Sequence, residues 1–146
     1  MEKRINIATI EPAAYKALMG LENYLATSTI NKTLKELIKI RASQINGCAF
    51  CINMHTIDAR KHGETEQRIY LLNAWKEVQE LYTQEERAVL ALTEEMTLIA
   101  NGGVSDETYQ KVKSFFDDGQ LAQLMLAIIT INAWNRMSVA TQLAPQ

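Results

Sequence analysis

Hydrophobic and polar residues recur along most of this chain with the three-to-four-residue spacing of amphipathic helices. Leu34, Leu37 and Ile38 follow this spacing within the segment 32–45 and would share a buried face. Alternation with a period of two is confined to the run RINIATI at residues 4–10, which we expect to form an extended arm. The pattern therefore predicts an all-α protein.

Capping residues and glycines divide the pattern into six to seven helices. Pro12 suits the first turn of a helix, Thr83 and Glu86 form a capping-box pattern, and Gly63 is typical of a helix end. We expect helices over about 12–26, 32–45, 48–62, 65–77, 83–100, 105–117 and 120–142. Because the connections are short and none has the composition of a linker, we expect one domain over residues 1–146.

Composition and charge narrow the class of protein. The 146 residues are enough for one sizeable core, and 47% hydrophobic with 22% charged residues is ordinary for a globular protein. A net charge of −2 argues against a nucleic-acid partner. No apolar run reaches the roughly 18 residues of a membrane span, and the first residues lack a signal-peptide core. We therefore expect a cytoplasmic protein without a membrane partner.

The segment 43–55, SQINGCAFCINMH, contains both cysteines and one of the two histidines of the chain. Three interpretations compete: a redox-active dithiol, a metal site, or inert cysteines packed in the core. In a reducing compartment, two cysteines three residues apart more often serve redox chemistry or metal binding than a structural disulfide.

Helical spacing would bring the reactive side chains of this segment together. If a helix begins at Cys48, the side chains of Cys48, Cys51 and His55 share one face. The first helical turn favours an anion, which would lower the pKa of the Cys48 thiol. His55 would accept the proton of Cys51, which is the arrangement of a nucleophile and its base. The two sulfurs are also close enough in sequence to form a disulfide.

A carboxylate has two possible roles in this region. A turn at Asn46–Gly47 would make the flanking helices antiparallel and bring Glu36 level with His55, where the carboxylate would orient the imidazole. Alternatively, Thr33 and Glu36 would form a capping box at the start of their own helix. The spacing alone leaves both roles open.

The distance between candidate ligands along the helix argues against the metal interpretation. Cys48, Cys51, His55 and His62 are the candidate zinc ligands, but His62 lies about 10 Å beyond His55 along a continuous helix. Zinc ligands lie about 2.0–2.3 Å from the ion, so one helix cannot close this shell. We expect no metal and no other cofactor.

Polar and aromatic residues near the end of the chain have a structural interpretation. Asn132, Asn135 and Arg136 would form hydrogen bonds between helices or subunits rather than line a site. Trp75 and Trp134 would be buried anchors of the core.

The run ELIKIRASQINGCAFCINMHTIDARKHG at 36–63 resembles the core motif of the alkylhydroperoxidase D (AhpD)-like branch of the carboxymuconolactone decarboxylase family. The segments TQEERAVLALTEEMT, VSDETY and INAWNR are similar to later parts of that branch, so the resemblance covers about residues 30–140, the expected domain core. It implies an AhpD-like all-helical fold that assembles into homo-oligomers, either trimers or hexamers.

The same resemblance implies a peroxiredoxin-type activity, the thiol-dependent reduction of hydroperoxides. In this interpretation Glu36, Cys48, Cys51 and His55 are catalytic, Cys51 attacks the hydroperoxide, and a separate dithiol, protein or small molecule, reduces the resulting disulfide. One position departs from the best-known hydroperoxidases, which have a second histidine where this chain has Phe50.

Other activities stay open beside this interpretation. One alternative is a general disulfide oxidoreductase without peroxidase activity, and another is a non-catalytic oligomeric module for redox sensing or stress response. Decarboxylation is the less expected activity, because the decarboxylases that name the family lack the dithiol.

Overall fold

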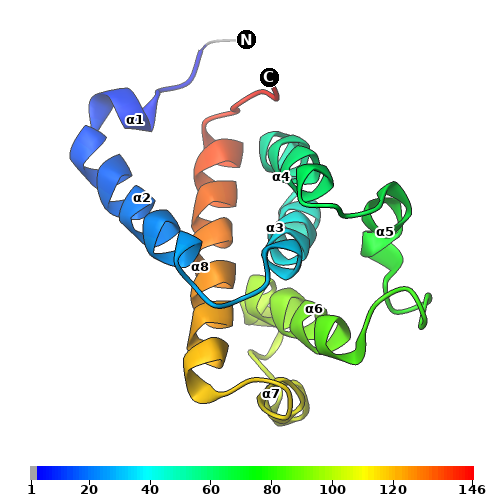
Figure 1. Ribbon diagram of the computed structural model, residues 1–146. Coiled ribbons are helices and arrows are strands. Elements are labelled where there is room, and N and C mark those ends of the chain that lie inside the picture. The colour runs from blue at the N-terminus through cyan, green and yellow to red at the C-terminus, as the bar shows by residue number, and fades with distance from the viewer. Residues whose placement is uncertain (1–2) are drawn as a thin grey trace.

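The computed structural model describes residues 3–146, and the regular elements in this range are all helical (Figure 1). The α-helices are α1 (Ile7–Ile10), α2 (Pro12–Ala26), α3 (Lys32–Asn46), α4 (Ala49–Lys61), α5 (Glu66–Tyr70), α6 (Gln84–Thr97), α7 (Asp106–Lys113) and α8 (Asp118–Ala140). Two short 3₁₀-helices, η1 (Leu72–Ala74) and η2 (Ile99–Asn101), complete the set. The expected all-α fold class is confirmed.

Helix α3 lies at the centre of the packing. It contacts α4, α6 and α8, and α8 also contacts α2 (Figure 1). Leu34 and Ile38 of α3 belong to one core cluster, shared mainly with α6 and α8, while Leu37 and Ile40 belong to a second cluster with α4, η1 and Trp75. Because α3 buries side chains on two faces, it fixes the position of α4.

The two ends of α3 have clear local causes. The side chain of Asn31 caps the N-terminus by accepting hydrogen bonds from the amides of Thr33 and Leu34, at 2.8 and 3.3 Å. At the other end Gly47 has a φ of +65°, a left-handed conformation that strains residues with a Cβ atom. Helix α4 begins at Ala49, two residues after Gly47, so α3 and α4 pack as a helical hairpin.

The expected extended arm is wrong over its second half. Asn6 accepts a hydrogen bond from the amide of Thr9 at 3.2 Å and so caps the short helix α1. None of the residues of α1 is buried. The alternation of apolar and polar residues in this segment therefore does not mark a strand with one buried face.

The helix expected over 65–77 is also wrong in its length. Helix α5 ends at Tyr70, and the chain continues through η1 into turns. Side chains hold these turns: Arg68 donates to the carbonyl of Leu81 at 2.5 Å, and Arg87 donates to that of Trp75 at 2.9 Å. Such long-range bonds to backbone carbonyls cannot be read from local helix propensity.

Capping determines the boundaries near the end of the chain. The capping box of Thr83 and Glu86 is present as expected. A second one joins Asp117 and Gln120, so α8 begins at Asp118. The preceding helix α7 ends at Lys113, with Ser114 as its C-cap, rather than at residue 117. Within residues 3–146, the helices are too short or too polar to cross a membrane.

Candidate dithiol active site

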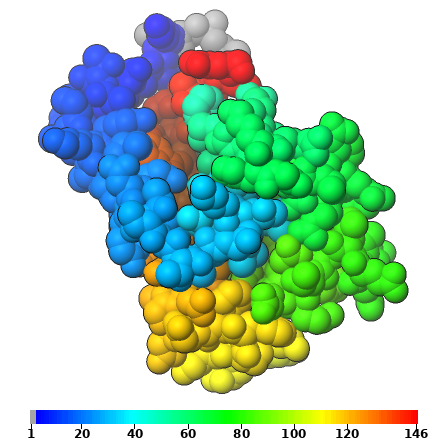
Figure 2. All heavy atoms as spheres, in the orientation of Figure 1, coloured from blue at the N-terminus to red at the C-terminus, as the bar shows by residue number. Residues whose placement is uncertain are grey.

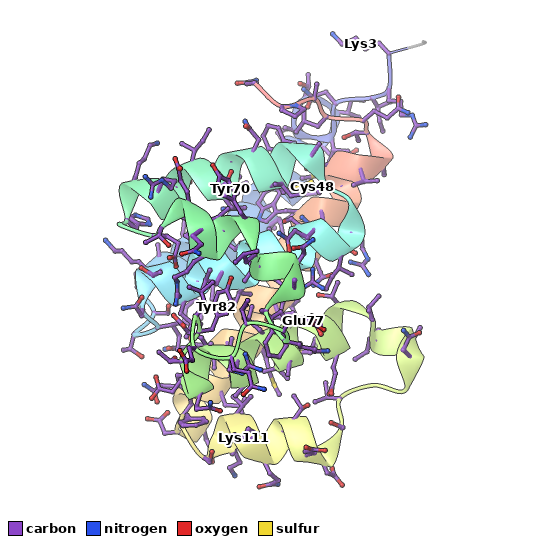
Figure 3. The ribbon with its side chains drawn as sticks, turned by 90° about the vertical axis from the view of Figure 1, so that its right-hand side faces the viewer. Lys3, Cys48, Tyr70, Glu77, Tyr82 and Lys111 are labelled. Carbon is purple, nitrogen blue, oxygen red and sulfur yellow. A yellow bond between two sulfur atoms is a disulfide. The ribbon has the colours of Figure 1, made fainter. Side chains whose placement is uncertain are left out.

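The two cysteines form a disulfide at the start of α4 (Figure 3). Their Cα atoms are 5.3 Å apart. Cys48 was expected within the first helical turn, but it is the N-cap residue, with an extended backbone that follows the left-handed turn of Gly47. Its sulfur accepts a hydrogen bond from the amide of Cys51 at 3.3 Å. A thiolate at Cys48 would therefore lie directly at the free amides of the helix N-terminus.

The disulfide is buried where α4 leaves the turn after α3. Each cysteine is 1% exposed. Both α3 and α8 contact α4, and Figure 3 shows Cys48 at the end of α4 that lies beside α8. Reaction at either sulfur therefore requires a substrate to enter this end of the helical packing.

His55 lies one helical turn after Cys51 on the buried face of α4. Its Nδ1 is 2.9 Å from the Oε2 of Glu36 on α3, as the antiparallel arrangement predicted. This contact leaves Nε2 as the ring nitrogen available for proton exchange with a thiol. In the disulfide state no hydrogen bond joins His55 to a sulfur within residues 3–146.

Glu36 is held as an anion by its neighbours. Burial raises the pKa of its carboxyl, but the hydrogen bond with His55 and the charge of Lys39 outweigh this effect and lower the pKa below the ordinary 4.5. The Nζ of Lys39 is 3.2 Å from the Oε1 of Glu36 and 3.5 Å from a carboxylate oxygen of Glu22. Because Asn31 caps α3, the capping-box alternative for Glu36 is wrong.

Lys39 and Glu22 were not among the residues singled out in the sequence. The spacing of Glu36 and Lys39, three residues apart on a helix, was a signal that could have found the lysine. Glu22 comes from α2 and has no such signal, because only the tertiary packing brings it near α3.

The four zinc ligands considered in the sequence do not form one site, because His62 lies apart from the other three. His62 is the exposed C-cap residue of α4, at the opposite end of the helix from the disulfide. A different set, Glu36, His55 and Asp58, has ligand atoms within 4.8 Å of one another. Its carboxylates are paired, since His55 and Lys39 bind Glu36 and Lys61 lies 3.4 Å from Asp58.

The asparagines of the INAWNR segment join α8 to α3, as expected for helix packing. The amide of Asn46 donates to the side-chain oxygens of Asn132 and Asn135, at 3.0 and 2.9 Å. Asn135 donates in turn to the hydroxyl of Ser43 at 2.9 Å, and Arg136 donates to the Oδ1 of Asn132 at 2.8 Å. These bonds brace the end of α3 that precedes the disulfide.

The aromatic residues have different degrees of burial. Trp75 is buried as expected and donates from its indole to Glu94 at 2.8 Å. Trp134 is only half-buried, and its indole donates to Glu22 at 3.1 Å. Phe50, between the cysteines, is half-buried and lines a cavity of about 680 Å³ between the N-terminal and C-terminal segments.

The fold and this site define a class: an all-helical protein with a buried C-x-x-C disulfide beside a histidine–glutamate pair on a helical hairpin. The sequence profile of the carboxymuconolactone decarboxylase family matches residues 12–95. The chain belongs to this family, in agreement with the resemblance found in its motifs.

Similar proteins of known sequence or structure extend this assignment. The uncharacterized protein YdfG of Bacillus subtilis is 52% identical over 140 residues, which cover 96% of this chain and 95% of YdfG. The solved structure of ATU0492, a protein of unknown function from Agrobacterium tumefaciens, has a TM-score of 0.94 and 40% identity, with 99% of each chain covered. The alkyl hydroperoxide reductase AhpD of Maricaulis maris is 40% identical over 47 residues, 32% of this chain and 27% of that protein.

Proposed function

We propose that this protein is a thiol-dependent peroxidase that reduces hydroperoxides through Cys48 and Cys51. The observation that carries the proposal is the Nδ1–Oε2 contact of 2.9 Å between His55 and Glu36, one helical turn from Cys51. A histidine oriented by an ionised carboxylate is suited to take a proton from a thiol and to stabilise the thiolate that remains. The similarity to an alkyl hydroperoxide reductase supports the same reaction class.

The proposed cycle has three balanced steps. The thiolate of Cys51 attacks the O–O bond of a hydroperoxide, and the alkoxide leaves as the alcohol with the proton from His55, so Cys51 becomes a sulfenic acid. The thiol of Cys48 then attacks that sulfur, forming the disulfide and releasing water. A separate dithiol reduces this disulfide by two exchange steps and is itself oxidised to a disulfide. This need for a reducing dithiol fits the cytoplasmic location expected from the sequence.

A specific observation favours a second candidate, a general disulfide oxidoreductase. Phe50 occupies the position where the best-known hydroperoxidases have another histidine, so one proton donor of their site is missing here. A dithiol–disulfide exchange needs only the two sulfurs and the His55–Glu36 pair. The two candidates therefore differ in whether a hydroperoxide is consumed.

A steady-state assay with a hydroperoxide and an excess dithiol separates the candidates. A peroxidase consumes many equivalents of hydroperoxide per protein, whereas an oxidoreductase reduces a disulfide substrate without consuming hydroperoxide. A redox sensor would be oxidised by about one equivalent and then stop. Absence of hydroperoxide turnover, with intact thiols before the assay, would rule out the proposed function.

Single cysteine variants test the order of the steps. In Cys48→Ser we expect one equivalent of hydroperoxide to be consumed and a sulfenic acid to be trapped on Cys51 by a dimedone label, without turnover. In Cys51→Ser we expect neither reaction. Full hydroperoxide consumption by Cys51→Ser would reverse the roles of the cysteines, which the position of Cys48 at the helix N-terminus makes a real alternative.

We also propose that the active form is a homo-oligomer, either a trimer or a hexamer. Several large hydrophobic side chains are exposed on the isolated chain and are available for contacts with further copies. They are Ile5, Ile10, Tyr24, Met54, Ile57, Tyr70, Leu98, Ile99, Ile129, Val139 and Leu143. Light scattering coupled to size-exclusion chromatography measures the mass, and a mass of 16.5 kDa at all concentrations would contradict an assembly.

A further inference from the structure

A cavity of about 260 Å³ lies outside the disulfide, between the end of α2, the first turns of α3 and the end of α4. Figure 2 shows this face, with the segment around residues 20–40 in its centre beside the end of α4. The cavity is lined by Glu22, Leu25, Ala26, Lys32, Lys35, Glu36, Lys39 and His62. Neither cysteine contributes to its wall, although the wall does include Glu36, the partner of His55.

The unusual group in this wall is the ammonium of Lys35. The residue is 8% exposed, and its Nζ donates to the carbonyl of Leu25 at 3.0 Å and to the hydroxyl of Ser28 at 3.4 Å. Both partners are neutral, and the ion pairs found within residues 3–146 do not include Lys35. A buried charge without a counter-ion is costly, and an ammonium has a third N–H to donate.

The nearby carboxylates are engaged elsewhere. Lys39 lies within 3.5 Å of oxygens of both Glu22 and Glu36. Trp134 donates to Glu22, and His55 is hydrogen-bonded to Glu36. Burial first, and then the charge of Lys39, lower the pKa of Lys35, and these effects outweigh the opposing charges of Glu36 and Glu22.

We propose that this cavity is a binding site for a small organic monocarboxylate, with Lys35 as the counter-ion of the carboxylate. The wall has three lysines and two glutamates, which leaves one positive charge when His62 is neutral. A monoanion matches that charge, while a dianion such as phosphate would leave an excess negative charge beside Glu22 and Glu36. Leu25 and Ala26 supply an apolar surface for a short hydrocarbon chain.

The size of the cavity restricts the ligand further. At about 260 Å³ it is slightly smaller than the range of roughly 300–1,000 Å³ that is usual for drug-sized ligands. A carboxylate with a chain of a few carbon atoms is therefore the expected class. The site does not depend on the proposed peroxidase function, because binding requires no reaction at the sulfurs.

Titration with sodium butyrate tests the site, at constant ionic strength held with sodium chloride. We expect saturable changes in the amide NMR signals of residues that line the cavity, including Lys32 and Lys39. The variant Lys35→Met should weaken binding by at least about tenfold, the loss expected for one charge-assisted hydrogen bond. Lys16→Met removes an exposed lysine of α2 and should change the affinity less than about twofold.

A measurement on the wild-type protein keeps the test independent of how the variant folds. Saturating butyrate should raise the pKa of the Lys35 ammonium, followed by NMR of its Nζ or Cε, because a bound anion favours the charged form. Saturable shifts at the cavity together with this rise support the site. Absence of saturation, equal binding of butyrate by Lys35→Met, or equal occupancy by chloride or inorganic phosphate would overturn it.

Discussion

The imidazole Nδ1 of His55 and the Oε2 of Glu36 are 2.9 Å apart, although the two residues are 19 positions apart in the sequence. The hairpin of α3 and α4 makes this contact, and burial of both residues, 7% and 6% exposed, protects it from water. A carboxylate in this position selects the tautomer in which Nδ1 carries the proton, so Nε2 can accept one. The proposed reaction depends on this selection.

Replacement of Glu36 should therefore slow the thiol chemistry. We expect Glu36→Gln to lower the rate of hydroperoxide consumption by roughly a hundredfold, the order of a general acid–base contribution, because an amide does not stabilise an imidazolium. Glu95→Gln is the matched control. Burial raises the pKa of Glu95, but hydrogen bonds from Ser105 and Thr108 outweigh this effect and lower it, as the neighbours of Glu36 do. Glu95 differs from Glu36 in its position, since it lies on α6 near the start of α7. Equal rates in the two variants would show that Glu36 has no part in the reaction.

Glu36 should also make stability depend on pH. Its pKa is lower in the folded protein than the ordinary 4.5, so the unfolded chain binds more protons at this position in acid. The contribution of Glu36 is therefore complete above about pH 5 and is lost as the pH falls through the folded pKa. We expect the difference in free energy of unfolding between wild type and Glu36→Gln to shrink from pH 6 to pH 3, measured by urea denaturation. A difference that stays constant over this range would contradict the assignment.

The main helices followed from hydrophobic periodicity and capping residues because both signals are local. Helix α2 has the bounds expected from Pro12, and the capping box at Thr83 starts α6. The chain between Tyr70 and Thr83 could not be predicted in this way, because Arg68 and Arg87 tie its turns to distant carbonyls. The single domain over residues 1–146 stays a prediction.

The site likewise combines residues whose arrangement the local spacing predicted with a residue that only tertiary packing brings close. Cys48, Cys51 and His55 come from one segment, so their spacing predicted that they would share a face of a helix, although Cys48 is the cap rather than a helical residue. The local spacing could not decide between the two roles of Glu36. It depended on Asn31 taking the N-cap, two residues before Thr33, and on the hairpin that brings α4 beside α3.

The cap of α3 gives a direct stability test of that choice. Asn31→Ala should lower the free energy of unfolding by about 1 kcal/mol, because two amides at the helix start lose their acceptor. Thr33→Ala, at the position of the rejected capping box, should change it by less than about 0.5 kcal/mol. Chemical denaturation of both variants measures the two values. A larger loss for Thr33→Ala would restore the capping-box role.

The contact between α3 and α8 contains a buried polar network whose energy can be measured. Asn135 is fully buried, accepts from Asn46 at 2.9 Å and donates to the hydroxyl of Ser43 at 2.9 Å. Truncation to Ala removes both bonds and leaves a cavity among groups that have little access to water. We expect Asn135→Ala to lower the free energy of unfolding by about 2–3 kcal/mol.

Neighbouring substitutions separate the network from the general cost of truncating a residue of α8. Val139→Ala shortens an exposed side chain of the same helix that has no polar atom to join the network, and it should cost less than about 0.5 kcal/mol. A double-mutant cycle of Asn46→Ala with Asn135→Ala should give a coupling energy of about 1 kcal/mol, since the two amides share a hydrogen bond. Additive effects of the two substitutions would mean that the asparagines act independently. Coupling would instead make this network a brace for the turn that carries Cys48, because Asn46 is the last residue of α3 before Gly47.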